Sequence, residues 1–151
     1  PERDDDKMTS ERKRRKLYMI DIIIVTHGEY GKAMLASSEL IMGEQENVQA
    51  FGFYLGESVE HLRDSILQAI SCTRKGSEIL ILTDMRSGSP FNVTASLMKD
   101  HTFEHLTGIN LPILLEILCS RTQMELKMMI AHIMSEGMKT LIHVNEMLKE
   151  D

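Results

Sequence analysis

Residues 20–28 are Ile-Asp-Ile-Ile-Ile-Val-Thr-His-Gly, and this stretch decides the fold. Its first six residues are rich in β-branched side chains, which favour a strand, and Thr-His-Gly then indicates a turn. A second apolar run, residues 78–84, consists almost entirely of Ile and Leu before it ends in Asp84. A strand that is apolar on both faces is typical of a parallel sheet covered by helices on both sides. We therefore predict two buried strands at these positions.

Strand-like and helix-like segments alternate along the rest of the chain. Helical spacing of apolar residues and helix start and stop signals predict helices at about residues 30–42, 59–70, 90–99, 111–120 and 122–137. Shorter runs predict strands at residues 48–54, 102–106 and 140–144. Ser89 is expected to cap the third helix, and Thr-Gln-Met-Glu at 122–125 fits a capping box for the last one. Such repeated strand–helix units predict an α/β fold, a doubly wound and mostly parallel sheet.

The chemistry of such a sheet is expected just beyond the carboxyl ends of its strands, near the point where the strand order reverses. This rule selects residues 26–28, Thr-His-Gly, and the loop at residues 84–90. In a parallel sheet His27 and Asp84 could meet at one edge. A carboxylate on one imidazole nitrogen fixes the tautomer and leaves the other nitrogen with a basic lone pair. The pair therefore predicts a histidine nucleophile.

The loop after Asp84 adds a predicted anion site. Ser87, Gly88 and Ser89 offer two hydroxyl groups and close approach of the backbone, and the helix that follows presents free N–H groups to an anion. Together these residues predict a nucleophile, an orienting aspartate and a phosphate cradle. Each of them is also common in purely structural roles, so a hydrogen-bonded turn histidine and a capping aspartate are the alternative at this stage.

The net charge of the 151-residue chain is −6, and it is unevenly distributed. Residues 1–18 hold seven basic and five acidic side chains, so residues 19–151 have a net charge of −8. An acidic body argues against nucleic-acid binding, because such domains depend on Lys and Arg that contact phosphates. Every aliphatic run is far shorter than the roughly 20 apolar residues of a transmembrane helix, so we expect no direct membrane insertion.

The two ends of the chain and its isolated side chains give further expectations. Residues 1–18 are predicted to be a disordered tail, an upstream start or a cloning remnant, and residues 19–151 a single domain. Cys72 and Cys119 lack metal-binding spacing, which indicates reduced core thiols of a cytoplasmic protein. His101 and His105 lie four residues apart in a strand-like stretch, which does not bring them together as metal ligands, so no metal site is expected.

Three longer motifs follow one another along the chain. Residues 23–34 are Ile-Ile-Val-Thr-His-Gly-Glu-Tyr-Gly-Lys-Ala-Met, residues 83–92 are Thr-Asp-Met-Arg-Ser-Gly-Ser-Pro-Phe-Asn, and residues 107–116 are Thr-Gly-Ile-Asn-Leu-Pro-Ile-Leu-Leu-Glu. In this order they resemble the enzyme IIA domain of the mannose family of the bacterial sugar phosphotransferase system. The resemblance spans roughly residues 19–144.

This resemblance implies a role for each matched residue. His27 would accept a phosphoryl group from the histidine-containing phosphocarrier protein and pass it to enzyme IIB, which serves the membrane subunits of a sugar transporter. Asp84 would hold the imidazole, and Ser89, with Gly88, Thr26 and Ser87 around it, would bind the phosphoryl group. The family loop is commonly Asp-x-x-Gly-Gly-Ser-Pro, so Ser87 stands here in place of its first glycine.

The resemblance also implies a homodimer in which a C-terminal antiparallel strand is exchanged, and residues 140–144 would supply that strand. It implies no cofactor, because phosphohistidine is already a good phosphoryl donor. Residues 28–32 have two residues between their glycines where a P-loop has four, which argues against ATP binding.

Two other functions fit the same fold. One is the phosphocarrier subunit of a dihydroxyacetone kinase, which resembles the same domain but serves a soluble kinase. The other is a non-catalytic signalling module, such as a receiver domain phosphorylated on Asp84, although receiver domains need an acidic pair where this chain has Thr-His-Gly.

Overall fold

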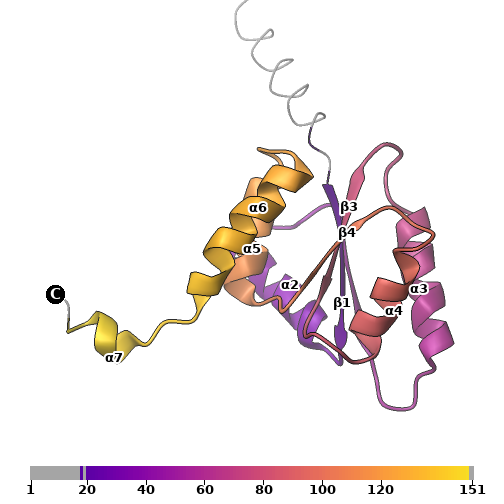
Figure 1. Ribbon diagram of the computed structural model, residues 1–151, viewed down its shortest axis with the longest axis horizontal. Helices are drawn as coiled ribbons and strands as arrows, with labels where there is room; N and C mark the ends of the chain where they lie inside the picture. The colour runs from indigo at the N-terminus through magenta and orange to yellow at the C-terminus, as the bar shows by residue number, and fades with distance from the viewer. Residues whose placement is uncertain (1–17, 19, 150–151) are drawn as a thin grey trace, which may run out of the picture.

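The computed structural model describes Tyr18 and residues 20–149, which form a parallel sheet with helices on both sides (Figure 1). The strands are β1 (Ile20–His27), β2 (Val48–Phe53), β3 (Glu78–Thr83) and β4 (Glu104–Thr107). Their order in the sheet is β2-β1-β3-β4, and every neighbouring pair is parallel. The predicted α/β class with a parallel four-stranded sheet is confirmed. The tail expected at residues 1–18 lies, apart from Tyr18, outside the described residues.

Helices cover the two faces of this sheet unequally, as Figure 1 shows. One face is covered by α2 (Tyr30–Met42), α5 (Leu111–Ser120) and α6 (Leu126–Glu136). The other is covered by α3 (Val59–Ser71) and α4 (Ser89–Leu97). The connection from β1 to β2 runs through α2 on one face, and the connection from β2 to β3 runs through α3 on the other face. The strand order therefore reverses beside β1, where doubly wound sheets place their active groups.

Strand β1 supplies side chains to both hydrophobic cores. Ile22 and Ile24 pack with the helices on the α2 side, and Ile23 and Val25 pack with those on the α3 side. All four are at most 1% exposed. This alternation explains why the strand is apolar at nearly every position, as expected for parallel strands buried on both faces.

Two helix starts differ from the prediction. Gly88, not Ser89, is the N-cap of α4, and Ser89 is the first helical residue. The capping box at 122–125 is not formed, because α6 begins only at Leu126. The backbone N–H groups of Gln123 and Met124 instead donate to the carbonyl of Ser120 at 2.8 and 3.3 Å, so the end of α5 continues into a turn across these residues.

The strand predicted at residues 140–144 is wrong for the single chain. A 3₁₀ turn, η1 (Gly137–Thr140), follows α6, residues 141–143 are extended, and a short helix, α7 (Val144–Met147), ends the described chain. Figure 1 shows this segment leading away from the sheet and its helices. A strand needs a hydrogen-bonding neighbour, and among the described residues none pairs with this segment.

Two further findings concern single residues and helix hydropathy. Cys72 and Cys119 are both exposed, so the prediction of core thiols is wrong. Cys72 is the C-cap of α3, and Cys119 lies on the exposed side of α5 between the buried Leu118 and Ser120. None of the helices in the described part of the chain has the length and hydropathy needed to span a bilayer.

Candidate functional site

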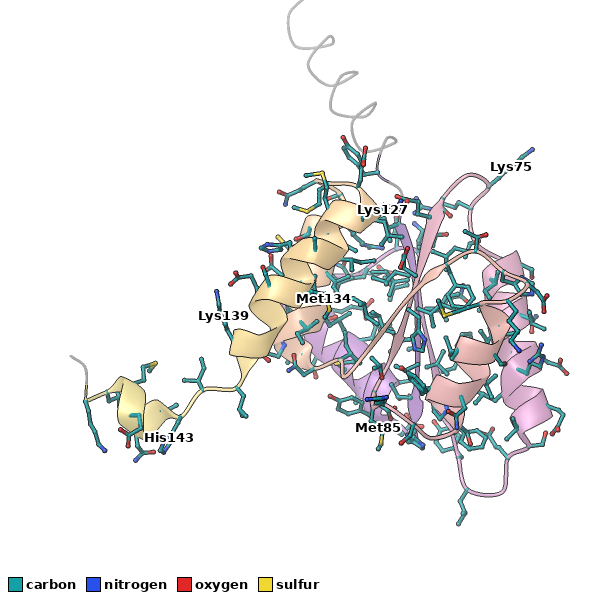
Figure 2. All side chains as sticks on the ribbon, viewed as in Figure 1. Lys75, Met85, Lys127, Met134, Lys139 and His143 are labelled. Carbon is teal, nitrogen blue, oxygen red and sulfur yellow. The ribbon has the colours of Figure 1, made fainter. Side chains whose placement is uncertain are left out.

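His27 and Asp84 meet at the carboxyl ends of two neighbouring strands. His27 is the last residue of β1, and Asp84 directly follows β3. Figure 2 shows the two ends of β3 through Lys75, which precedes it, and Met85, which follows Asp84 at the opposite end of the sheet. His27 Nδ1 lies 2.8 Å from Asp84 Oδ2. The structure thus brings together the two residues that the sequence placed at one edge.

One carboxylate oxygen of Asp84 binds two groups of His27. Asp84 Oδ2 accepts hydrogen bonds from the backbone N–H and from Nδ1 of His27, both at 2.8 Å. The other oxygen, Oδ1, accepts from the backbone N–H of Met85 at 2.9 Å. With its proton on Nδ1, the neutral imidazole has a free lone pair on Nε2. The His27 side chain is 44% exposed and that of Asp84 only 13%, so the carboxylate is shielded while the imidazole is accessible.

Gly88 lies against the reactive edge of the imidazole. A Cβ atom at this position would lie 2.9 Å from His27 Cε1 and 3.0 Å from Nε2. The backbone of Gly88 has φ +90° and ψ 168°, a conformation that is essentially confined to glycine. Ser87, just before it, has φ +76°, which explains the first glycine of the common family loop. A glycine is therefore required at residue 88 on two independent grounds.

The start of α4 lies next to Gly88, which contacts the Nε2 edge of His27. Ser89 is its first residue, Pro90 has no N–H group, and the Asn92 N–H donates to the Gly88 carbonyl at 2.9 Å. The N–H groups of the first helical residues have no intrahelical acceptor, and the helix dipole adds a partial positive charge. Ser89 and these amides therefore form a suitable environment for an anion beside Gly88 and Nε2.

Thr26 has a different place from the one predicted. Its side chain is fully buried, and its Oγ1 accepts a hydrogen bond from the Gly31 N–H at 2.7 Å. The hydroxyl thus supports the first turn of α2 instead of facing the accessible side of His27. Gly31 is packed against it, since a Cβ there would lie 3.0 Å from Thr26 Oγ1.

Comparison with known proteins decides the family. The model of the family described as "PTS system fructose IIA component" matches residues 21–134. The chain belongs to this family. It is 38% identical to the PTS system fructose-specific EIIA component of Bacillus subtilis (strain 168) over 110 residues, which are 72% of this chain and 75% of the relative. It is 34% identical to the PTS system sorbose-specific EIIA component of Lacticaseibacillus casei over 116 residues, covering 76% and 83% of the two chains.

A solved structure agrees with this assignment. The phosphotransferase system component EIIA from Streptococcus agalactiae superposes with a TM-score of 0.78 at 32% sequence identity, over 85% of this chain and 99% of that chain. The protein is thus an EIIA component of the sugar phosphotransferase system.

In this EIIA component a polar cluster that the sequence did not reveal supports the turn after His27. The Gly28 N–H donates to the Phe53 carbonyl at 2.9 Å. Next to it the Tyr54 hydroxyl donates to the Glu29 carboxylate and accepts a hydrogen bond from Lys32 Nζ at 3.0 Å. This hydrogen bond, together with the negative charge of Glu29, raises the pKa of Lys32. The one available signal was Gly52 inside a strand, where a glycine often marks close backbone approach.

A second cluster of the EIIA site lies behind Asp84. His105 Nε2 and the Thr83 hydroxyl are 2.9 Å apart, and that hydroxyl donates to Thr107 Oγ1 at 2.9 Å. The ring of Phe91, in the first turn of α4, lies 5.3 Å from the His105 ring. Burial lowers the pKa of His105. This cluster joins the end of β3 to β4 and to α4, so it fixes the strand end from which Asp84 projects.

Proposed function

We propose that this EIIA component accepts a phosphoryl group on Nε2 of His27 from the phosphocarrier protein and passes it to enzyme IIB. The observation that supports this most directly is the contact of Asp84 Oδ2 with His27 Nδ1 at 2.8 Å. It directs the proton to Nδ1 and leaves Nε2 as the nucleophile on the accessible side of the ring.

The transfer is an in-line displacement at phosphorus. The Nε2 lone pair forms the new P–N bond while the bond between phosphorus and the donor's imidazole breaks, and its electron pair returns to the donor nitrogen. His27 becomes positively charged as it attacks, and the Asp84 carboxylate stabilises that charge. In the second step His27 is the donor, and the same displacement transfers the phosphoryl group to a histidine of enzyme IIB. Positioning and charge stabilisation are the main requirements of such a loose transition state.

The phosphoryl oxygens would be bound at the start of α4. Ser89 supplies a hydroxyl donor, and the free amides of the first helical turn supply backbone donors. Gly88 allows the loop to approach Nε2 without a clash. We assign Ser87 and Thr26 supporting roles, Ser87 in the shape of the loop and Thr26 in the turn below His27. The proposal includes no metal or cofactor, because the donor is already activated.

The test is phosphorylation of the purified chain by phosphoenolpyruvate, enzyme I and the phosphocarrier protein. His27→Ala is expected to abolish incorporation, whereas His61→Ala, a change at an exposed histidine in the first turn of α3, should leave it unchanged. The phosphate should be acid-labile and base-stable, and nitrogen-15 NMR should place it on Nε2. Stoichiometric labelling of the His27→Ala variant, or an acid-stable phosphate, would refute the assignment. Onward transfer to enzyme IIB, and not to a kinase subunit, identifies the sugar-transport branch.

We further propose that residues 141–148 of one copy pack on a second copy. Leu141, Ile142 and Leu148 are 93%, 58% and 64% exposed, which is unusual for three large apolar side chains within eight residues. Leu141 and His143 have extended backbone angles, and Figure 2 shows His143 well away from the sheet.

The proposed receiving surface is an apolar cavity of about 360 Å³ beside β4, lined by Leu106, Ile109, Ile113, Ile133 and Met134 among others. In the described chain β4 pairs with β3 alone, so its outer edge can accept an added strand. This is the surface on which an exchanged antiparallel strand would complete the sheet.

Sedimentation of the full chain tests this assembly. The double variant Leu141→Asp, Ile142→Asp is expected to sediment as a monomer, because charges would be buried in the cavity. Leu55→Asp, at a residue as exposed as Leu141, is the matched control and should leave the sedimentation unchanged. A monomeric wild-type chain, or a double variant that remains dimeric, would contradict this proposal without affecting the role of His27.

A further inference from the structure

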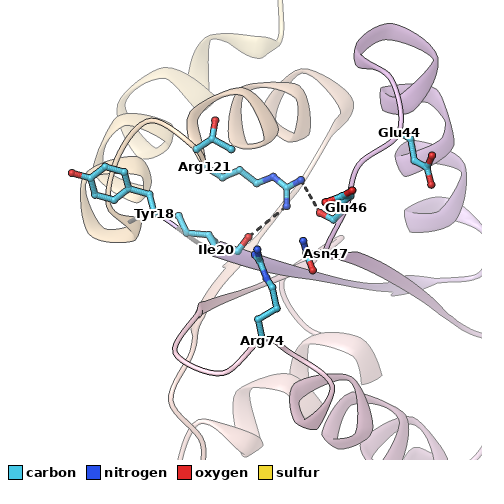
Figure 3. Close-up of a pocket in the computed structure, with 8 residues that line it drawn as sticks. Tyr18, Ile20, Glu44, Glu46, Asn47, Arg74 and Arg121 are labelled. Carbon is cyan, nitrogen blue, oxygen red and sulfur yellow. Dashed lines mark hydrogen bonds between the residues drawn. The ribbon is translucent and has the colours of Figure 1, made fainter. Parts of the chain in front are cut away.

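A polar cavity opens at the end of the sheet opposite to His27 (Figure 3). It has a volume of about 390 Å³ and is lined by Tyr18, Glu46, Asn47, Arg74, Arg121 and Thr122 among others. Arg74 and Arg121 come from different walls, the loop before β3 and the end of α5, and Figure 3 shows their side chains pointing toward each other. We call this space the arginine cavity.

Arg121 is a buried cation without an anionic partner. It is only 9% exposed, and its terminal nitrogens donate to neutral oxygens, the Glu46 carbonyl at 2.8 Å and Gln45 Oε1 at 3.2 Å. A third contact, to the Ile20 carbonyl, is long at 3.5 Å. Across the described residues no carboxylate lies within salt-bridge distance of Arg121, and its Nε has no hydrogen-bond partner. Buried charges in proteins are normally paired, so this guanidinium is set up for a ligand.

Arg74 already forms a salt bridge with Asp21, and this carboxylate has no oxygen left to pair with Arg121. Both oxygens of the buried Asp21 are used by Arg74, Oδ1 by the guanidinium and Oδ2 by the backbone N–H at 2.9 Å. Two guanidinium groups therefore face one cavity with one internal carboxylate between them. Burial lowers the pKa of Arg121 and the nearby charge of Arg74 lowers it further, whereas the charges of Asp21 and Glu46 act in the opposite direction and are outweighed.

The acidic side chains at the rim offset this arrangement only in part, since Glu46 raises the pKa of Arg121 less than burial lowers it. Glu44 and Glu46 also line the cavity, but both are exposed, and solvent and salt screen exposed charges far more than buried ones.

We propose that the arginine cavity binds a small organic oxyanion, with its phosphate or carboxylate group between Arg74 and Arg121. Both groups match the planar fork of a guanidinium, and the cavity volume lies within the range of about 300–1,000 Å³ found for small-molecule sites. The two sources of this chemistry are phosphate esters and carboxylate metabolites. The site lies at the far end of the sheet from His27, so the outcome of its test does not depend on the proposed phosphoryl transfer.

The test is a proton–nitrogen NMR titration of the full chain at constant ionic strength. Inorganic phosphate, phosphoenolpyruvate and malonate are the probes, and they separate the phosphate from the carboxylate source. Saturable shifts of the Asn47, Arg74 and Thr122 amides are expected with at least one probe. Shifts at the His27 and Gly88 amides report the other anion site and can be fitted separately. No saturable shift at the cavity amides with any probe up to about 10 mM overturns the proposal.

Substitutions at Thr122 provide a matched control, because this residue is exposed and its change leaves the buried arginines in place. Thr122→Glu adds a negative charge at the cavity and should weaken binding by about threefold or more at moderate salt. Thr122→Gln has nearly the same shape without the charge and should change the affinity by less than about twofold. Equal affinities of these two variants would show that the probe binds elsewhere.

Discussion

The closest test of the reaction geometry is the replacement of Gly88 by alanine. Its new Cβ would lie 2.9 Å from His27 Cε1 and 3.0 Å from Nε2, closer than carbon atoms pack in proteins. The neighbouring atom that must move is the end of the imidazole, and its movement weakens the 2.8 Å contact with Asp84. The substitution therefore changes the position of the nucleophile without removing any functional group.

Two separate costs follow from the structure. Alanine at φ +90° and ψ 168° is strained by about 1–3 kcal/mol, and this lowers the free energy of unfolding. Loss of the charge-assisted hydrogen bond to Asp84 raises the activation free energy of transfer by about 1.5–2 kcal/mol. This is the lower end of the usual range, because His27 is 44% exposed and solvent screens its charge. At 1.4 kcal/mol for each factor of ten, this corresponds to a transfer rate about 10–30 times lower.

Gly43 offers a control with the same backbone strain. It has φ +85° and ψ 173°, almost the conformation of Gly88, but a Cβ there would meet nothing within 4 Å. Urea unfolding should show similar losses of stability for Gly88→Ala and Gly43→Ala. Rapid-quench measurement of phosphoryl transfer from the phosphocarrier protein should show a slower rate for Gly88→Ala alone. Equal transfer rates in the two variants would refute the reasoning.

Three further predictions concern single side chains. Asp84→Asn should slow transfer by about 10–30 times, measured in the same quench assay, because the neutral amide cannot stabilise the charged imidazole; an unchanged rate would remove Asp84 from the mechanism. Ser87→Gly should raise the free energy of unfolding by about 0.5–1 kcal/mol, because Ser87 has φ +76°, whereas Ser37→Gly within α2 should lower it by a similar amount in the same urea titration. Burial lowers the pKa of His105 from 6.5, so the unfolded chain binds this proton at a higher pH than the folded chain. Its stabilising contribution is therefore complete above about pH 6.5 and declines as the pH falls, and His105→Gln should have a flatter stability profile below about pH 6.5.

The strands and the central pair of the site could be predicted because each depends on local sequence. The run of β-branched residues in β1 is sufficient to indicate a buried parallel strand, and parallel strands bring their carboxyl ends to one edge. In such a sheet His27 and Asp84 could therefore meet, provided that their strands are neighbours. The 2.8 Å contact confirms that expectation.

The support of the site depends on contacts between distant segments, which no local pattern records. Tyr54 reaches Glu29 across 25 residues, and Thr83 reaches the ring of His105 across 22. Thr26, with its hydroxyl group next to His27, is typical of an anion-binding turn, but this hydroxyl accepts a hydrogen bond from the Gly31 amide. Cys72 and Cys119 are exposed because of where they fall on their helices, Cys72 at the C-cap of α3 and Cys119 between two buried residues of α5, which residue type alone does not indicate.

The shared oxygen of Asp84 has a consequence for how this protein can vary. Because Oδ2 accepts from both the backbone and the ring of His27, the position of the imidazole depends on the spacing of β1 and β3 as well as on the loop that contains Asp84 and Gly88. Sheet spacing is among the least variable dimensions of a protein. Loop positions that do not contact His27 or Asp84 are therefore freer to change with the partner proteins, whereas Gly88 is fixed by its contact with the imidazole.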